Sequence, residues 1–437
     1  MRGYVLLMLL WACTAPCLAD DAAVAAWVRT QAVPFESLDS NEYFSSLRDV
    51  VGDASVVSFG EANHNAHEFL ILRNRVFRYL VEELGYTAFA AETDFVRAIE
   101  VDRYVNAEIG RAEEHANAVL SWSYASFAEN RELIDWLREY NDRPSTKRKV
   151  RFYGLEAAGN LDQDARHTLT YALEYVRKVD SVAADGLGRR VNAWKHGFAQ
   201  PEYQKLSARL RNDMVADIGD LVTAFEQWHV HWIQRSSPLE YHRAYRAAIA
   251  ARQVAASLRI GGGGRDIASF DNLRWALERE GPAGRIFVFM HNMHVTRWRK
   301  FAPPDHPLHS SLGEHADELL GKRMVVIGTS HFAGVTRNWL DLEGFDNCER
   351  RLEPARADSF DAELARAEMP RFFLKLGDAP APVAQWLDQE RPVRNVNIRP
   401  GYSPLRPVRS FDAVFFVRDI QPLRFIGGRL GACEPTR

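Results

Sequence analysis

Short, almost continuous apolar runs constrain most strongly what this chain can fold into. They recur along the chain and are separated by stretches with helical periodicity. The runs lie at 55–59, 87–91, 150–154, 285–290, 324–328, 371–374 and 413–417. Such runs are typical of strands buried on both faces, as in parallel sheets covered by helices. We therefore predict an α/β fold with a mainly parallel sheet covered by helices on both faces.

Helical periodicity fills the segments between these runs. One helix is predicted at about 66–84 and is ended by Gly85, since glycine commonly follows the last helical turn. The stretch 163–258 is helical throughout, with apolar residues recurring at i, i+3, i+4 and i+7. We interpret it as a long all-helical insertion over the carboxyl edge of the sheet. The glycines of 261–264 follow it as a flexible loop.

The first residues are typical of a secretory signal peptide. Arg2 precedes an apolar run, Tyr4–Cys13, and small residues then offer a cleavage site that would remove 1–19. The run is too short for a transmembrane helix. A lipoprotein box is the weaker interpretation, because Trp11 stands where a small residue is usual. We expect an exported protein, periplasmic or secreted, with one α/β domain at 20–437.

Composition excludes some partners. With a net charge of −3 and a pI near 6.6, the chain lacks the excess positive charge that is typical of proteins that bind nucleic acid. No further stretch is long and apolar enough to suggest a membrane span. Removal of the signal would leave Cys348 and Cys433, which can pair or remain thiols and do not form a zinc motif. The oligomeric state is left open.

Acidic and imidazole side chains follow the apolar runs again and again. Glu61 and His64 come after the first run, inside a turn that begins at Gly60 and leads into a helix. The others are Glu92 after 87–91, Glu156 after 150–154, His291 and His294 after 285–290, and His331 after 324–328. Because the carboxyl ends of parallel strands meet at one edge, we expect these groups to converge and to perturb one another's pKa values.

This combination favours acid–base chemistry on water. A serine elbow of the form Gly-x-Ser-x-Gly is absent from the sequence. An imidazole can instead act as general base, oriented by carboxylates, while Arg73 or a second histidine stabilises an oxyanion. Two alternatives remain open. One is a metal-dependent hydrolase that uses the same Glu/His edge, including His291 and His294. The other is a non-catalytic binder of a large hydrophobic ligand.

Several motifs, in order along nearly the whole mature chain, resemble the erythromycin esterase family. The first spans residues 60–73, and a later one carries His291, Asn292 and His294. Further matching segments are Trp136–Asn141, Phe152–Glu156, Arg265-Asp266, Gly328–Ser330 and Ser410–Asp412.

The resemblance implies hydrolysis of an ester or lactone, which in the family's namesakes is the macrolactone of erythromycin, without a required metal or other cofactor. Carried over by position, His64 would be the base that activates water, and Glu61 and Glu92 would orient it. Arg73 and His291 would complete the polar site. We assign the remaining candidates to binding of the small-molecule ester or lactone, namely Glu68, Glu156, His294 and His331.

Overall fold

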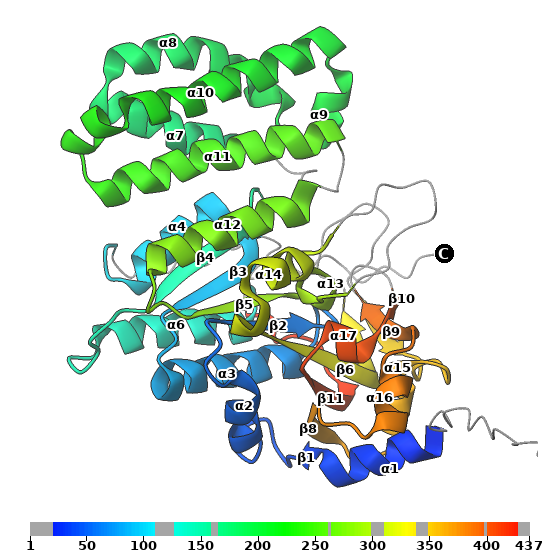
Figure 1. Cartoon of the computed structure of the whole chain (residues 1–437). Coiled ribbons are helices and arrows are strands. Elements are labelled where there is room, and N and C mark those ends of the chain that lie inside the picture. Colours follow the sequence, from blue (N-terminus) through cyan, green and yellow to red (C-terminus); the bar gives the residue numbers. More distant parts are fainter. Residues whose placement is uncertain are drawn as a thin grey trace, which may run out of the picture.

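The computed structural model describes residues 21–109, 126–158, 165–260, 264–298, 310–337, 348–396 and 400–426. Within these ranges nine strands form one mixed sheet in the order β1-β8-β11-β6-β2-β5-β3-β4, with β7 paired to β6 (Figure 1). Their bounds are β1 Val33–Pro34, β2 Val56–Glu61, β3 Ala88–Asp94, β4 Arg151–Glu156, β5 Ile286–His291, β6 Met324–Arg337, β7 Glu349–Leu352, β8 Arg371–Lys375 and β11 Ala413–Ile420.

The strands from β11 to β4 are mutually parallel, whereas β8, β1 and β7 are antiparallel to their neighbours. The predicted fold class, a mainly parallel sheet covered by helices, is therefore confirmed. A small hairpin of β9 (Arg391–Val396) and β10 (Pro400–Leu405) was not predicted. β6 also extends well beyond the predicted run 324–328, so that His331 lies within the strand and not after its end.

Alternation along each strand divides the core into two layers. In β2, Val57 and Phe59 face one layer of helices, whereas Val56 faces the other. The first layer contains α2 (Phe44–Val51), α3 (His67–Leu84) and α6 (Ala128–Asp142). The second contains α1 (Asp21–Gln31), α12 (Gly264–Glu280), α14 (Leu312–Leu320), α15 (Phe360–Ala365) and α16 (Ala381–Leu387). Because both faces are covered, the parallel strands can be apolar throughout.

The predicted helix 66–84 is α3, and it ends as expected at Gly85, whose φ of 70° lies in the left-handed region. In the described part of the chain no helix is long and apolar enough to cross a membrane. Cys348 is disulfide-bonded, and Cys433 lies outside the described residues. The predicted signal peptide, 1–19, also lies outside them.

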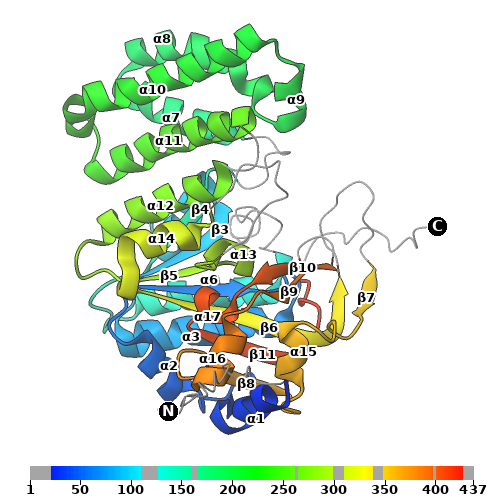
Figure 2. The same cartoon turned by 45° about the vertical axis from the view of Figure 1, so that its right-hand side comes forward.

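The segment between β4 and α12 forms a separate helical layer with its own apolar core. Its helices are α7 (Arg166–Val179), α8 (Ser181–Val191), α9 (Gln200–Lys205), α10 (Ala208–Gln234) and α11 (Pro238–Ile260), with a 3₁₀ turn at Asn192–Gly197. The layer packs on α12 and on α4 (Phe95–Val105), beside the edge strand β4 (Figures 1 and 2). It approaches the carboxyl edge through the first turn of α7, where His167 bonds Asp94 at 2.6 Å.

Gly60 lets a side-chain amide cross over β2. Asn292, which follows β5, donates from Nδ2 to the carbonyl oxygen of Thr329 in β6 at 2.8 Å, although β2 lies between these two strands. A Cβ on Gly60 would overlap the Asn292 side chain and would lie 2.7 Å from Cγ2 of Val295. The missing side chain therefore fixes how closely the residues after β5 approach β2.

We expect Gly60→Ala to lower the free energy of unfolding by about 1–3 kcal/mol, the usual cost of overpacking a buried site. Thermal and urea unfolding would measure it. Gly219→Ala is the matched control, because a Cβ at this position in α10 meets no atom within 4 Å. That control should be neutral or slightly stabilising. Equal stability of the two variants would contradict a tight crossing at Gly60.

Candidate active site

The carboxyl ends of β2 and β5 bring the first two candidates together. Glu61 and His291 are direct partners in the parallel register of these strands. The turn after β2 then carries His64 back to Glu61, so that His64 Nδ1 lies 2.6 Å from Glu61 Oε1. The turn is held by Asn63 Oδ1, which accepts the amide N–H of Asn65 at 2.9 Å. The result is a carboxylate–imidazole pair in which Glu61 is buried, His64 is partly exposed and the ring orientation is fixed.

His291 lies beside this pair as a neutral ring. Its ring centroid is 4.8 Å from that of His64. Burial and the neighbouring positive charge of His64 hold the pKa of His291 well below its usual range. Nδ1 accepts the amide N–H of Met293 at 3.3 Å, so the proton of the neutral ring lies on Nε2. Among the described residues, His291 Nε2 and Glu61 Oε2 are buried atoms with no hydrogen-bond partner.

Glu92 lies near the end of β3, which continues to Asp94 and not, as predicted, only to 91, and it holds the backbone of His291. Its Oε2 accepts the amide N–H of His291 at 2.7 Å. Burial would raise the pKa of Glu92, but the charges of His294, His64 and Arg265 and the His291 N–H bring it down to about 2. Glu92 is therefore a carboxylate at neutral pH.

Arg265, in the first turn of α12, joins two strand ends. It forms an ion pair with Glu92 Oε1 at 2.7 Å and a very short contact with Glu156 at the end of β4. Burial raises the pKa of Glu156 despite Arg265, whereas the pKa of Glu92 is lowered. One guanidinium thus serves two buried carboxylates whose affinities for protons are pushed apart.

A second carboxylate–imidazole pair closes the cluster. His294 Nδ1 lies 2.5 Å from Oδ1 of Asp266, the neighbour of Arg265, and His294 Nε2 lies 3.6 Å from Glu92 Oε1. The first turn of α12 therefore contacts Glu92, Glu156 and His294. Like the first turn of α7, it is a helix N-terminus that contacts the strand ends.

Arg73 lies behind the pair, on α3. Its guanidinium sits 4.5 Å from the ring centroid of Phe289 and donates to the side-chain oxygens of Asn74 and Asn130. Its side chain is almost wholly buried. Burial raises the pKa of Glu61, and the positive charge of Arg73 opposes that rise. The position suits support of Glu61 and not direct contact with solvent.

The sequence and the fold are similar to those of known proteins. A model of the erythromycin esterase family matches residues 81–420. The chain belongs to this family. Membership implies an ester hydrolase. The matched residues include Glu92 and His291, whereas Glu61 and His64 precede them.

Individual relatives are distant. The chain is 23% identical to erythromycin esterase type II of Escherichia coli over 299 residues, which are 62% of this chain and 68% of that protein. A solved protein of Bacillus cereus has the same fold, with a TM-score of 0.80 and 23% identity over 94% of this chain and 100% of that one. A mutant of the erythromycin esterase EreC in its open conformation gives a TM-score of 0.67 and 17% identity, covering 88% and 95%. At these identities the two structures show the shared fold.

Two predicted residues lie in other surroundings. Glu68 Oε2 accepts the amide N–H of Gln421 at 2.9 Å and so anchors the segment after β11. His331 lies inside β6 with its ring 5.9 Å from Phe69, and burial together with the charge of Arg394 lowers its pKa to about 3. Neither makes any of the contacts that join the cluster, and their assignment to substrate binding stays a prediction.

Roles for Arg265 and Asp266 were missed by sequence reasoning. They appeared only as a matching dipeptide, without a function. Both lie in the first turn of a helix and do not follow an apolar run, so the strand-end pattern does not include them. The available signal was an adjacent cation and anion directly after the four-glycine stretch.

Replacement of Arg265 tests the shared ion pair. Arg265→Gln leaves Glu92 and Glu156 buried without their cation, so the free energy of unfolding should fall by on the order of 2 kcal/mol. The loss is not larger because the guanidinium is partly exposed to solvent. The loss should shrink as pH falls from about 7 to 4, since the freed carboxylates then bind protons. Thermal unfolding across this pH range measures the effect. Arg274→Gln, exposed on the same helix, is the control, and a pH-independent loss would contradict the ion-pair account.

Proposed function

We propose that the protein hydrolyses a carboxylic ester or lactone with water activated by His64. The observation that carries this proposal is the Glu61–His64 pair, set beside a neutral His291 ring. The pair supplies an oriented base, and the ring supplies a hydrogen-bond donor. These are the two functions that acyl transfer to water requires.

The proposed reaction follows from the protonation states. His64 donates Nδ1–H to Glu61, and its Nε2 removes a proton from water as the water oxygen attacks the substrate carbonyl carbon. The carbonyl oxygen becomes an oxyanion and accepts a hydrogen bond from His291 Nε2–H. His64 then returns the proton to the leaving alkoxide as the ester C–O bond breaks, giving a carboxylic acid and an alcohol. The negative charges of Glu61 and Glu92 stabilise the imidazolium formed in between.

The substrate we propose is a macrolide lactone or another large ester. Support comes from the family, since a relative that matches is named for erythromycin hydrolysis. We also propose that the protein is exported after removal of 1–19, which N-terminal sequencing of the natural protein would test.

His64→Ala tests the general base. We expect kcat to fall by about two to four orders of magnitude, the usual effect of losing such a group. Product formation from erythromycin and from an aryl ester would be followed by mass spectrometry and absorbance. A folded His64→Ala protein with near-normal turnover would rule out this base. If neither ester is hydrolysed by the unaltered protein, the non-catalytic binder becomes the better account.

Chelation separates the metal-dependent alternative. Within the described residues no group of three or more His, Cys, Asp or Glu side chains is arranged to hold a metal ion. We expect activity to survive extensive treatment with EDTA. Activity that is lost to EDTA and restored by zinc or manganese would make the metal-dependent hydrolase the leading proposal.

The pH profile tests the role of Glu61. Burial lowers the pKa of His64, but the hydrogen bond to Glu61 and the charges of Glu61 and Glu92 outweigh it, so that the pKa is raised above 6.5. The base must be neutral, so kcat/KM should rise with pH through that raised value and be lost below it.

Glu61→Gln removes the main cause that raises this pKa while burial still lowers it. The midpoint should therefore move to lower pH, and the plateau should fall by roughly 10²–10⁴, as when other imidazole–carboxylate pairs are broken. Glu129→Gln is the control, because Glu129 forms a comparable pair with His67, at 2.5 Å, outside the cluster. A midpoint that is unchanged in Glu61→Gln would contradict His64 as the titrating base.

A further inference from the structure

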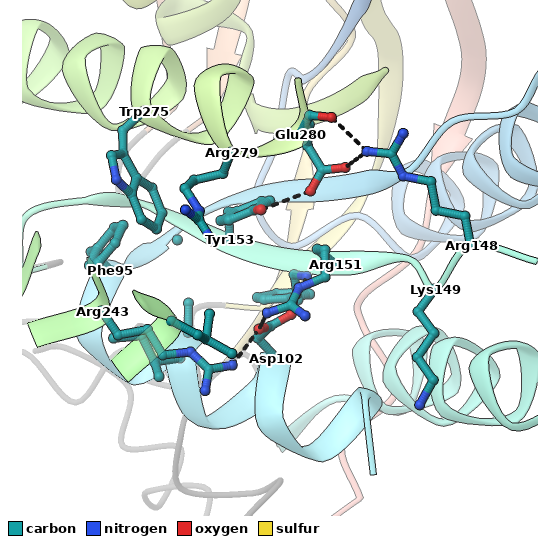
Figure 3. A pocket seen from close by; sticks show the side chains of 15 residues that line it. Phe95, Asp102, Arg148, Lys149, Arg151, Tyr153, Arg243, Trp275, Arg279 and Glu280 are labelled. Atoms are coloured by element: carbon teal, nitrogen blue, oxygen red, sulfur yellow. Dashed lines mark hydrogen bonds and ion pairs between the residues drawn. The ribbon is translucent and has the colours of Figure 1, made fainter. Parts of the chain in front are cut away.

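A cavity lies at the outer edge of the sheet, away from the strand ends that carry the cluster. It has a volume of about 360 Å³, which is the size of a small-ligand pocket. Its walls come from β4, α4, α11 and α12, where the helical layer meets the α/β core (Figure 3). β4 ends the sheet, so its outer edge has no neighbouring strand among the described residues. The proposed hydrolysis does not use this cavity.

The lining is strongly cationic. Five positively charged side chains face two carboxylates, those of Asp102 and Glu280. The positive side chains are Arg148, Lys149, Arg151, Arg243 and Arg279. Three positive charges remain after these two carboxylates are counted, and two remain once Glu108, which forms an ion pair with Arg243 at 2.9 Å, is included. A recess with one sign of charge and low-dielectric walls concentrates ions of the opposite sign.

The two carboxylates hold most of the arginines in fixed positions. Asp102 accepts from Arg151 at 2.6 Å and from Arg243 at 2.9 Å. Glu280 accepts from Arg148 at 2.7 Å and from the Tyr153 hydroxyl at 2.8 Å. Both acids are almost fully buried. The guanidinium groups are therefore preorganised, which lowers the entropy cost of binding an anion.

Arg279 is different from these arginines. No hydrogen bond or ion pair engages its side chain within the part of the chain that the structure describes, and in Figure 3 it extends between Trp275 and Tyr153. It is the cation best placed to bind an incoming group.

Aromatic rings form the remaining wall. Trp275 packs against Phe95 at 5.2 Å and against Tyr153 at 5.8 Å, both edge to face. Such a wall can pack against a flat apolar group. We propose that the cavity binds a small organic anion, in which a phosphate-type head is attached to an aromatic ring. The head lies against Arg279 and the fixed arginines, and the ring lies against Trp275.

Isothermal titration of the full mature chain with phenyl phosphate tests this site. We expect saturable binding with a Kd of about 0.1–1 mM, in keeping with a ligand of this size. Affinity should fall with added salt. Inorganic phosphate, which lacks the ring, and benzyl alcohol, which lacks the charge, should each bind more weakly. A phenyl carboxylate that binds as tightly as phenyl phosphate would overturn the preference for a phosphate-type head.

Arg279→Ala should weaken phenyl phosphate binding at least about fivefold, the size of one charge-assisted contact. It should leave hydrolysis of an aryl ester unchanged. Arg274→Ala, on the same helix but outside the cavity, is the matched control and should bind normally. Binding must also persist in His64→Ala, which distinguishes this cavity from the proposed active site. The absence of saturable binding up to roughly 10 mM, or equal losses in the two arginine variants, would overturn the proposal.

Discussion

The parallel register between β2 and β5 is the constraint on which the candidate active site depends. It sets Glu61 opposite His291, and β3, on the other side of β5, carries Glu92 two residues before its end at Asp94. These side chains are thus held by backbone hydrogen bonds in the middle of the sheet, which has nine strands among the described residues. Gly60 and the Asn292 amide add a link across β2. A displacement of one residue in any of these strands would turn its side chain to the opposite face.

Burial gives these side chains their separate protonation states. Isolated charges are costly inside a protein, and here the acids are paired with imidazoles, with Arg265 or with backbone N–H groups. Glu92 consequently holds its charge, while Glu156 gains affinity for a proton. The pKa values of the two histidines diverge in the same way. That of His64 is raised by the carboxylate of Glu61, whereas that of His291 is lowered by burial and by the charge of His64. Two rings of one residue type can therefore serve as base and as donor.

Arginines of α11 and α12 form ion pairs near the two ends of β4. At one end of that strand, Arg243 of α11 reaches Asp102, which also accepts the amide N–H of Phe152. At the other end, Arg265 reaches Glu156. The two sites discussed above thus lie at opposite ends of the same edge strand. α11 supplies Arg243 to the cavity, and α12 supplies Arg265 to the strand-end cluster.

The sequence by itself determined the mainly parallel character of the sheet, the helix after Gly60 and the presence of Glu61 and His64 in one turn, but not β1, β7 or the strand order. Apolar runs report burial, and two residues three positions apart in one turn meet without help from the rest of the chain. The convergence of Glu92 and His291 followed from the rule that parallel strands end at one edge.

Only the tertiary structure decided the contacts of Arg265 and Asp266, because the helical layer separates α12 from β3 and β4 in the chain. It also decided the surroundings of Glu68 and His331. The apolar run at 324–328 gave no sign that β6 continues to Arg337, since three buried polar residues, 329–331, follow it and the next four are only half-buried. Local patterns record which side chains are buried and in what order, but the neighbours of a buried charge, and hence its protonation, depend on segments distant in the chain.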